Sequence, residues 1–243
     1  MEYIAIALAP GIAICLYILY KDIYNREPKL NLIVSFVLGC IAIVPAIYFE
    51  GYFSYTSDGS VAGTAIYTYA IVGFIEEFAK FAGLRFYSYN QKSFDEPLDG
   101  IIYGVVVSMG FATVENLLYV LKYAELGMGL EVGIKRAFLT VPAHASFGVV
   151  MGYFIGRAKF EPAKSFMLMV AGLISAIILH GTFDFFLFVY GSTLWGRGVG
   201  EGLLVGGALV SFIISLLLSR KLLRSHQRTS KQLFTLKKND PGV

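Results

Sequence analysis

The chain has 243 residues, of which 56% are hydrophobic and only 15% are charged. A composition this apolar leaves too little polar surface to cover a soluble globule of the same length. Cys15 and Cys40 both lie inside apolar runs, which excludes a disulfide framework and a cysteine metal site. Nothing in the sequence indicates nucleic-acid binding, and the lipid bilayer is the expected surrounding of the protein.

Seven apolar runs, separated by short polar breaks, are long enough to cross a membrane. A hydrocarbon core of about 30 Å needs a helix of roughly 20 apolar residues. In chain order the runs cover residues 3–20, 30–49, 65–87, 99–121, 137–156, 165–190 and 202–219. Glycine and proline inside them are compatible with membrane helices, where small residues allow close packing. The predicted fold is an all-α polytopic membrane bundle of about seven transmembrane helices.

Residues 1–224 are expected to form a single transmembrane domain, because no internal repeat or second domain is visible. Residues 225–243 are expected to form a basic, polar cytoplasmic tail that is disordered. His226 lies in this predicted tail, so a solvated side chain is expected for it.

Lysine and arginine residues alternate between the connections. The first, third and fifth connections and the tail carry 15 of them, whereas the second, fourth and sixth carry 4, including Arg136 and Arg197. Because loops rich in Lys and Arg remain in the cytoplasm, the N-terminus is predicted to lie outside and the C-terminus inside.

Eight polar or ionisable side chains fall inside the predicted spans. They are Glu76, Glu77, Lys80, Glu115, Asn116, His144, His180 and Asp184. A charge at the centre of a membrane helix costs about 2.5–3.5 kcal/mol, so such residues are functional by default. Since residues three or four positions apart share a helix face, Lys80 is predicted to contact both glutamates and His180 to contact Asp184.

The depth of these side chains can be predicted from the rise of about 1.5 Å per helical residue. Glu115 and His180 each lie about 24 Å from the cytoplasmic end of their helices on this measure. His144 lies about 12 Å from the outer end, and Glu77 about 12–18 Å above the inner face. All four are expected to converge in the outer half of the bilayer.

Peptide-bond hydrolysis without a metal is one chemistry that fits these residues. It needs an activated water, a base and donors for the oxyanion. Glu76 or Glu77 would act as the base. His180 and Asn116 would stabilise the oxyanion, and Asp184 would orient the imidazole.

Metal-dependent hydrolysis fits equally well. His144, His180 and Glu115 would bind zinc and leave one coordination position open, while Glu77 would act on the bound water. A different function, an ion- or proton-coupled transporter, would use the same residues as a relay. Transporters usually show inverted repeats, and none is visible in this sequence.

Four segments resemble the signature segments of the PrsW intramembrane proteases. They are GFIEEFAKF (73–81), LDGIIYGVVVSMGFATVENLLYV (98–120), VPAHASFGVVMGYFIGRAKF (141–160) and ILHGTFDFF (178–186). The segment APGIAICLYILYKDIYNREP (9–28) is similar to the start of that family. The resemblance implies membership of the wider group that contains the CAAX prenyl endopeptidases and the bacteriocin-processing enzymes.

The resemblance also implies roles for individual residues. Glu76 and Glu77 match the catalytic pair of the family and His180 its essential histidine, while Glu115, Asn116 and His144 lie in accompanying motifs. The domain over residues 1–224 would then be a protease domain. Its implied reaction is the first (site-1) cut in a single-pass membrane substrate, an anti-sigma factor of a stress response, on the extracytoplasmic side. Both the glutamate and the metal mechanism remain open.

Overall fold

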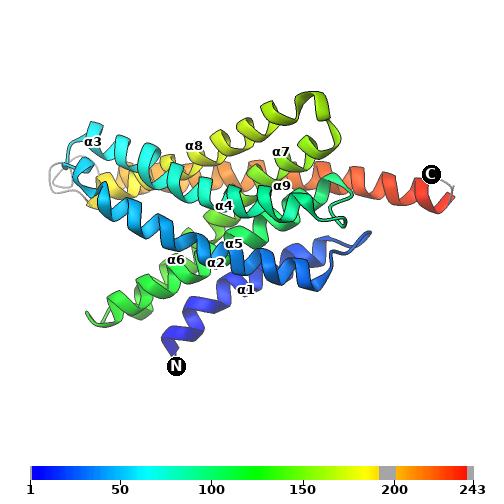
Figure 1. Cartoon of the computed structure of the whole chain (residues 1–243). Coiled ribbons are helices and arrows are strands. Elements are labelled where there is room, and N and C mark those ends of the chain that lie inside the picture. Colours follow the sequence, from blue (N-terminus) through cyan, green and yellow to red (C-terminus); the bar gives the residue numbers. More distant parts are fainter. Residues whose placement is uncertain (1, 192–200, 240–243) are drawn as a thin grey trace.

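The computed structural model of the chain describes residues 2–191 and 201–239. Its regular elements in this part of the chain are helices (Figure 1). The α-helices are α1 (Glu2–Lys21), α2 (Lys29–Tyr52), α3 (Val61–Ala65), α4 (Phe74–Phe86), α5 (Pro97–Ala124), α6 (Gly129–Phe138), α7 (Thr140–Phe160), α8 (Ser165–Gly191) and α9 (Glu201–Asn239). The π-helix η2 (Ile66–Gly73) joins α3 to α4 without a break. Short 3-10 turns η1 (Ser54–Thr56), η3 (Ser88–Asn90) and η4 (Pro162–Lys164) lie between longer helices.

The all-α, multi-pass fold expected from the sequence is confirmed. Each of the seven predicted runs coincides with helical structure, and six helices of the described residues are long and apolar enough to cross a membrane. The helix over residues 61–86 carries Glu76, Glu77 and Lys80 and is not one of those six. Arg197, which was counted on the outer side, lies outside the described residues.

The fifth predicted run begins too late. The helical structure starts at Gly129 in α6, turns at Leu139 and continues as α7. Arg136, predicted to lie in a connection, is therefore a helical residue, and its side chain forms an ion pair with Glu115. In the sequence, Arg136 is typical of a polar connection, because its partner Glu115 lies 21 positions away on another helix.

The last predicted run ends too early, since α9 continues to Asn239. The prediction of a disordered tail from Ser225 is wrong for the part that the structure describes. His226 is 3% exposed, and its ring stacks on Tyr153 with 4.2 Å between the ring centroids. One turn later, the hydroxyl of Ser230 donates to Oε1 of Glu96 at 2.7 Å. The tail helix is polar in composition, but one face of it is packed against the bundle.

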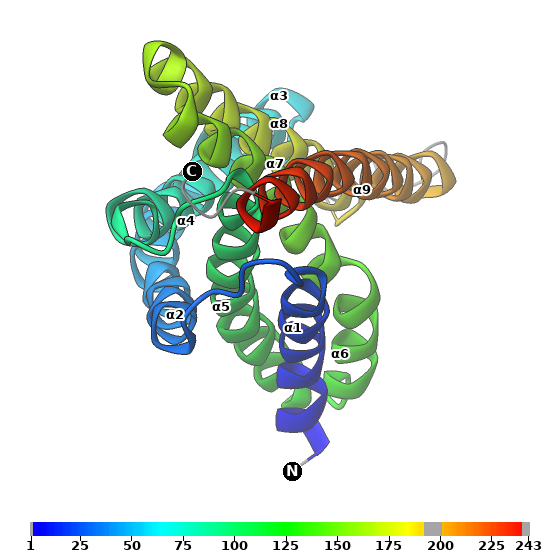
Figure 2. The same ribbon diagram turned by 90° about the vertical axis from the view of Figure 1, so that its right-hand side faces the viewer.

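Helix α5 is the centre of the bundle and contacts α1, α2, α4, α6, α7 and α9. Figure 2 shows it between α1 and α2. Its crossing with α7 is made by glycines, because a Cβ on Gly152 would lie 2.2 Å from the carbonyl oxygen of Gly100. Gly104 and Gly148 meet one turn further along. Small residues allow two membrane helices to approach this closely, and the crossing holds the segments that carry Glu115 and His144 side by side.

Candidate active site

Helix α4 carries two carboxylates and one ammonium on adjoining faces. Nζ of Lys80 lies 3.0 Å from Oε2 of Glu76 and 2.8 Å from Oε1 of Glu77, which confirms both contacts predicted from helical spacing. The three residues are 1%, 4% and 0% exposed, in the same order. The ammonium also lies 4.1 Å from the centre of the Phe111 ring. Buried charges persist only when they are paired in this way.

His180 on α8 contacts both carboxylates of α4 and one further carboxylate, that of Asp184. Its Nδ1 donates to Oε1 of Glu77 at 2.9 Å. Its Nε2 lies 3.2 Å from Oδ2 of Asp184 and 3.9 Å from Oε2 of Glu76, so the predicted contact between His180 and Asp184 is also confirmed. Carboxylate oxygens on both sides of the ring hold the imidazole in one orientation.

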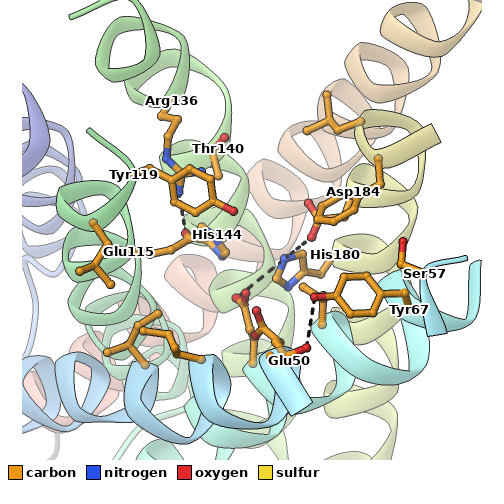
Figure 3. Close-up of a pocket in the computed structure, with 18 of the residues that line it drawn as sticks. Glu50, Ser57, Tyr67, Glu115, Tyr119, Arg136, Thr140, His144, His180 and Asp184 are labelled. Atoms are coloured by element: carbon orange, nitrogen blue, oxygen red, sulfur yellow. Dashed lines mark hydrogen bonds and ion pairs between the residues drawn. The ribbon is translucent and has the colours of Figure 1, made fainter. Parts of the chain in front are cut away.

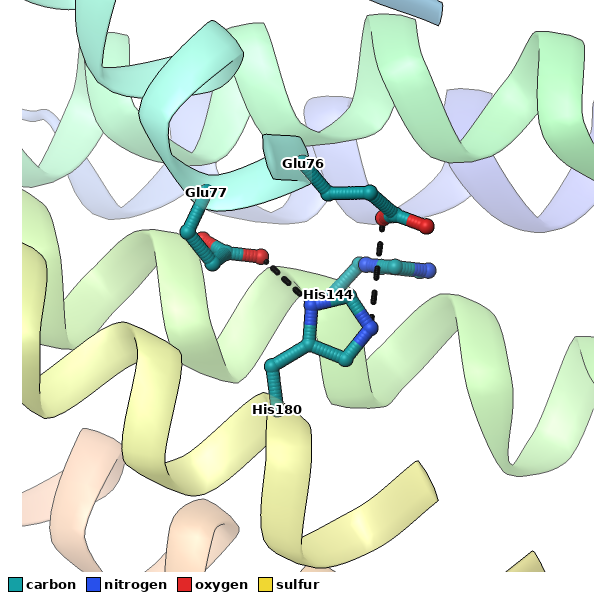
Figure 4. A group of neighbouring side chains, drawn as sticks. All are labelled: Glu76, Glu77, His144 and His180. Carbon is teal, nitrogen blue, oxygen red and sulfur yellow. Dashed lines mark hydrogen bonds and ion pairs between the residues drawn. The ribbon is translucent and has the colours of Figure 1, made fainter. Parts of the chain in front are cut away.

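His144 on α7 completes the cluster. Its Nδ1 lies 3.1 Å from Nζ of Lys80, and its Nε2 lies 2.9 Å from Oε2 of Glu115. The imidazole rings of His144 and His180 meet edge to face with centroids 5.0 Å apart. Figure 4 shows both rings beside the two carboxylates of α4.

The four side chains in Figure 4 fit a divalent metal ion. Glu76, Glu77, His144 and His180 each offer one ligand atom, and these atoms all lie within 4.8 Å of one another. Atoms bound to one zinc at about 2.0–2.2 Å can be at most about 4.4 Å apart, so a small contraction suffices. Oε2 of Glu77 is buried without a hydrogen-bond partner, which leaves one oxygen of the cluster available to a cation. Two imidazoles with carboxylates are a donor set suited to zinc.

This set differs at one point from the zinc ligands expected from the sequence. Glu115 does not belong to the group, and the carboxylates of α4 take its place. The reason is Arg136, whose Nη2 lies 2.7 Å from Oε2 of Glu115. Glu115 thus neutralises a buried guanidinium and accepts a hydrogen bond from His144 instead.

Asn116 lies away from the cluster. Its Nδ2 donates to the carbonyl oxygen of Ala7 at 2.9 Å, and its Oδ1 accepts from Nε of Arg136 at 3.1 Å. Both polar atoms of the Asn116 amide are thus engaged by α1 and α6, away from the Glu/His cluster. The oxyanion role expected for Asn116 has no support in this geometry.

A cavity of about 1010 Å³ reaches the cluster (Figure 3). Five of the predicted site residues line it, namely Glu76, Glu115, His144, His180 and Asp184. Glu77 is not part of the lining and lies behind Glu76, against Lys80 and His180. The cavity lies where α2, α5 and α8 end and where α3 and α7 begin, as the lining by Gly51, Thr64, Tyr123, Thr140 and Phe188 shows.

The structure adds residues to the cavity that the sequence did not single out. Glu50 lies near the end of α2, and its Oε1 is buried in the protein without a hydrogen-bond partner. Tyr67 also lines the cavity and donates its hydroxyl to the carbonyl oxygen of Glu50 at 3.4 Å. Tyr119 lies against Arg136, with 4.1 Å from the guanidinium to the ring centre. Only one of these residues could have been found from the sequence. Glu50 follows the predicted outer end of its span, on the side where the site was expected.

Comparisons with known proteins identify the family of the chain. Residues 27–219 match the family model described as PrsW family intramembrane metalloprotease. The chain is 37% identical over 185 residues to a Protease PrsW of Shouchella clausii, covering 76% of this chain and 83% of the relative. It is 36% identical over 197 residues to one of Geobacillus kaustophilus, covering 81% and 84%. The Protease PrsW of Bacillus subtilis is 37% identical over 185 residues, covering 76% and 82%.

No solved structure matches the chain. The family match spans most of the sequence and includes every residue of the buried Glu/His cluster. The chain therefore belongs to the PrsW family of intramembrane metalloproteases, and it is a peptidase.

Proposed function

We propose that this peptidase makes the first cut in a single-pass membrane protein, on the extracytoplasmic side, and that the substrate is an anti-sigma factor of a stress response. The observation that carries the proposal is the buried cluster of Glu76, Glu77, His144 and His180, next to a cavity of about 1010 Å³. A space of this size admits an unwound peptide segment, and the cluster supplies the groups that hydrolysis needs. The alternative function, a coupled transporter, is not supported, because the matching family is one of intramembrane metalloproteases.

The charge pattern supports the side of the membrane that we propose. The cavity lies at the end of the bundle where α2, α5 and α8 end. The 15 to 4 distribution of Lys and Arg favours the extracytoplasmic side for that end. The helix over residues 61–86 would then be a seventh crossing, between an outer connection and an inner one. A cut near this cavity would fall in the outer part of the substrate's transmembrane segment.

Glu76 is the side chain best placed to act as the base, because its carboxylate lines the cavity. It takes a proton from the attacking water, whose oxygen forms a bond to the carbonyl carbon of the scissile peptide. The C–N bond then breaks, and the proton passes from Glu76 to the departing nitrogen. Lys80 holds the Glu76 carboxylate at 3.0 Å and keeps it aimed at this position.

The resident metal would be held by Glu77, His144 and His180, and Glu76 would lie beside it as the base. When bound, a zinc ion supplies Lewis acidity to the water and to the developing oxyanion. The neighbours of these ligands hold them in place. Asp184 orients the ring of His180, and Glu115 orients the ring of His144.

Co-expression with a tagged single-pass anti-sigma factor tests the proposal. Immunoblots should show a shortened product with the wild-type chain and none with Glu76→Gln. Glu131→Gln is the matched control, because Glu131 is a glutamate on the exposed face of α6, paired with Lys135. A product of the same size and amount with Glu76→Gln would overturn the proposed role of the cluster. Cleavage of other single-pass proteins, but not of anti-sigma factors, would overturn the substrate class alone.

A further inference from the structure

A second cleft of about 460 Å³ lies between α1, α5, α7 and α9. It shares no lining residue with the active-site cavity. Nothing in the proposed hydrolysis uses it.

Each wall of the cleft is one face of a helix. On α1 the lining residues include Ile14, Ile18 and Lys21, which are spaced four and three positions apart. On α9 they include Leu216, Arg220 and Arg224, each four positions from the next. Residues at this spacing lie on one side of a helix. Both faces therefore change from apolar to basic along the chain, and in the same direction.

The two basic ends meet at one place. Nε2 of Gln227 on α9 donates to the carbonyl oxygen of Lys21 at 3.1 Å, which brings the end of α1 beside the basic turn of α9. The wall contributed by α7 is mostly apolar, with Pro142, Ala145 and Val149 beside Ser146. The cleft is thus a site with cations at one end and a hydrocarbon-like wall over the rest.

The cations of this cleft have no acidic partner in the described part of the chain. Lys21, Arg220 and Arg224 form no salt bridge there, and no aspartate or glutamate lines the cleft. Other basic residues of the bundle are paired, such as Lys80, Arg136 and Arg157. Three unpaired cations around one opening attract an anion.

We propose that this cleft binds an anionic phospholipid. The headgroup phosphate lies against Lys21, Arg220 and Arg224, and one acyl chain lies along the apolar wall formed by α1, α5 and α7. A free phosphate ion would use the cations but would leave the apolar wall empty. The continuity of the basic end with the apolar wall therefore favours a lipid, in the leaflet at that end of the bundle.

Native mass spectrometry of the purified full chain with phosphatidylglycerol and phosphatidylcholine measures the binding. The wild-type chain should retain phosphatidylglycerol in preference to phosphatidylcholine. The double variant Arg220→Gln/Arg224→Gln should bind it about 30-fold more weakly, since each basic residue beside an anionic lipid contributes a factor of about five. The matched control is Lys221→Gln/Arg228→Gln, which removes the same charge from exposed positions of α9 outside the cleft.

A third variant separates the lipid from a phosphate ion. Ala145→Phe fills the apolar wall and leaves the cations untouched, so it should lower phosphatidylglycerol binding while size-exclusion profiles remain those of the wild type. Equal losses in the two double variants would mean attraction to overall charge and would overturn the proposal. Unchanged lipid binding in Ala145→Phe, together with full competition by inorganic phosphate, would replace the lipid by a phosphate site and would also overturn it.

Discussion

Glu77 and His180 lie 103 positions apart in the sequence, yet Nδ1 of His180 donates to Oε1 of Glu77 at 2.9 Å. The same oxygen accepts from Nζ of Lys80 at 2.8 Å, whereas the other oxygen of Glu77 is buried without a partner. Glu77 therefore connects α4 to α8, and its second oxygen remains available to bind a metal ion. Glu76, its neighbour, faces the cavity. The two adjacent glutamates thus have different surroundings and should respond differently to substitution.

Glu77→Gln should abolish cleavage and lower the metal content, because the amide removes the negative charge from a buried ligand position. Glu76→Gln should abolish cleavage with a smaller loss of metal, because it removes the base and keeps Glu77, His144 and His180, the residues that would hold the metal. Both variants should insert and accumulate, since glutamine preserves the shape of the side chain. Immunoblots for cleavage and elemental analysis for metal distinguish the two. Wild-type cleavage by both variants would contradict the assignment of this cluster as the active site.

Purified protein should carry about one equivalent of a divalent metal ion, because the four donors converge on a single centre. Prolonged chelation should remove both the metal and the cleavage activity, and added zinc should restore them. His144→Ala and His180→Ala should each lower metal retention. Full activity of protein proved free of metal would instead favour the metal-free glutamate mechanism.

Topology can be measured with reporter fusions. Alkaline phosphatase fused after Ser57, in the connection between α2 and α3, should be active. The same enzyme fused after Ser93 or after Asn239 should be inactive. Ser93 lies in the third connection and Asn239 in the tail, and both segments are rich in Lys and Arg and are expected in the cytoplasm. Activity of the fusion after Asn239 would reverse the proposed orientation and move the cavity to the cytoplasmic side.

The sequence predicts contacts within one helix well and contacts between helices poorly. The pairs of Lys80 with Glu76 and Glu77 and of His180 with Asp184 follow from helical spacing alone. The partner of Glu115 does not, because the rotation of α5 against α6 depends on packing that a single sequence does not display. Arg136 was placed in a loop for this reason.

The burial of a polar residue is also difficult to predict from the residues around it in the sequence. His226 lies among lysines, arginines and serines, so the sequence around it is typical of a solvated tail. Its burial depends on Tyr153, on a helix far away in the sequence. Glu50 likewise lies near a helix end, where a charge is common, and only the fold brings that end to the cavity.

The ion pair between Arg136 and Glu115 predicts that substitutions of Arg136 and of its neighbour Lys135 affect the stability differently. The side chains of this pair are 11% and 14% exposed, whereas those of Lys135 and Glu131 are 67% and 62% exposed. Arg136→Gln should leave the Glu115 carboxylate without its partner and destabilise the fold by on the order of 3 kcal/mol. Lys135→Gln should leave stability unchanged, because exposed ion pairs contribute little. Thermal unfolding of the two variants in the same detergent tests this, and equal melting temperatures would contradict it.

The glycine crossing of α5 and α7 should not tolerate a larger side chain. A side chain at Gly152 would meet the backbone of Gly100 at 2.2 Å, and backbone cannot rotate away as a side-chain tip can. Gly152→Val should therefore force the two helices apart and lower the stability by about 1–3 kcal/mol or more. Gly206→Val on α9 is the control, because nothing lies within 4 Å of a Cβ at that position. Separation of α5 from α7 would also pull Glu115 away from His144, so cleavage should fall along with the melting temperature. A Gly152→Val protein with the melting temperature and cleavage of the Gly206→Val control would show that this crossing does not hold the site together.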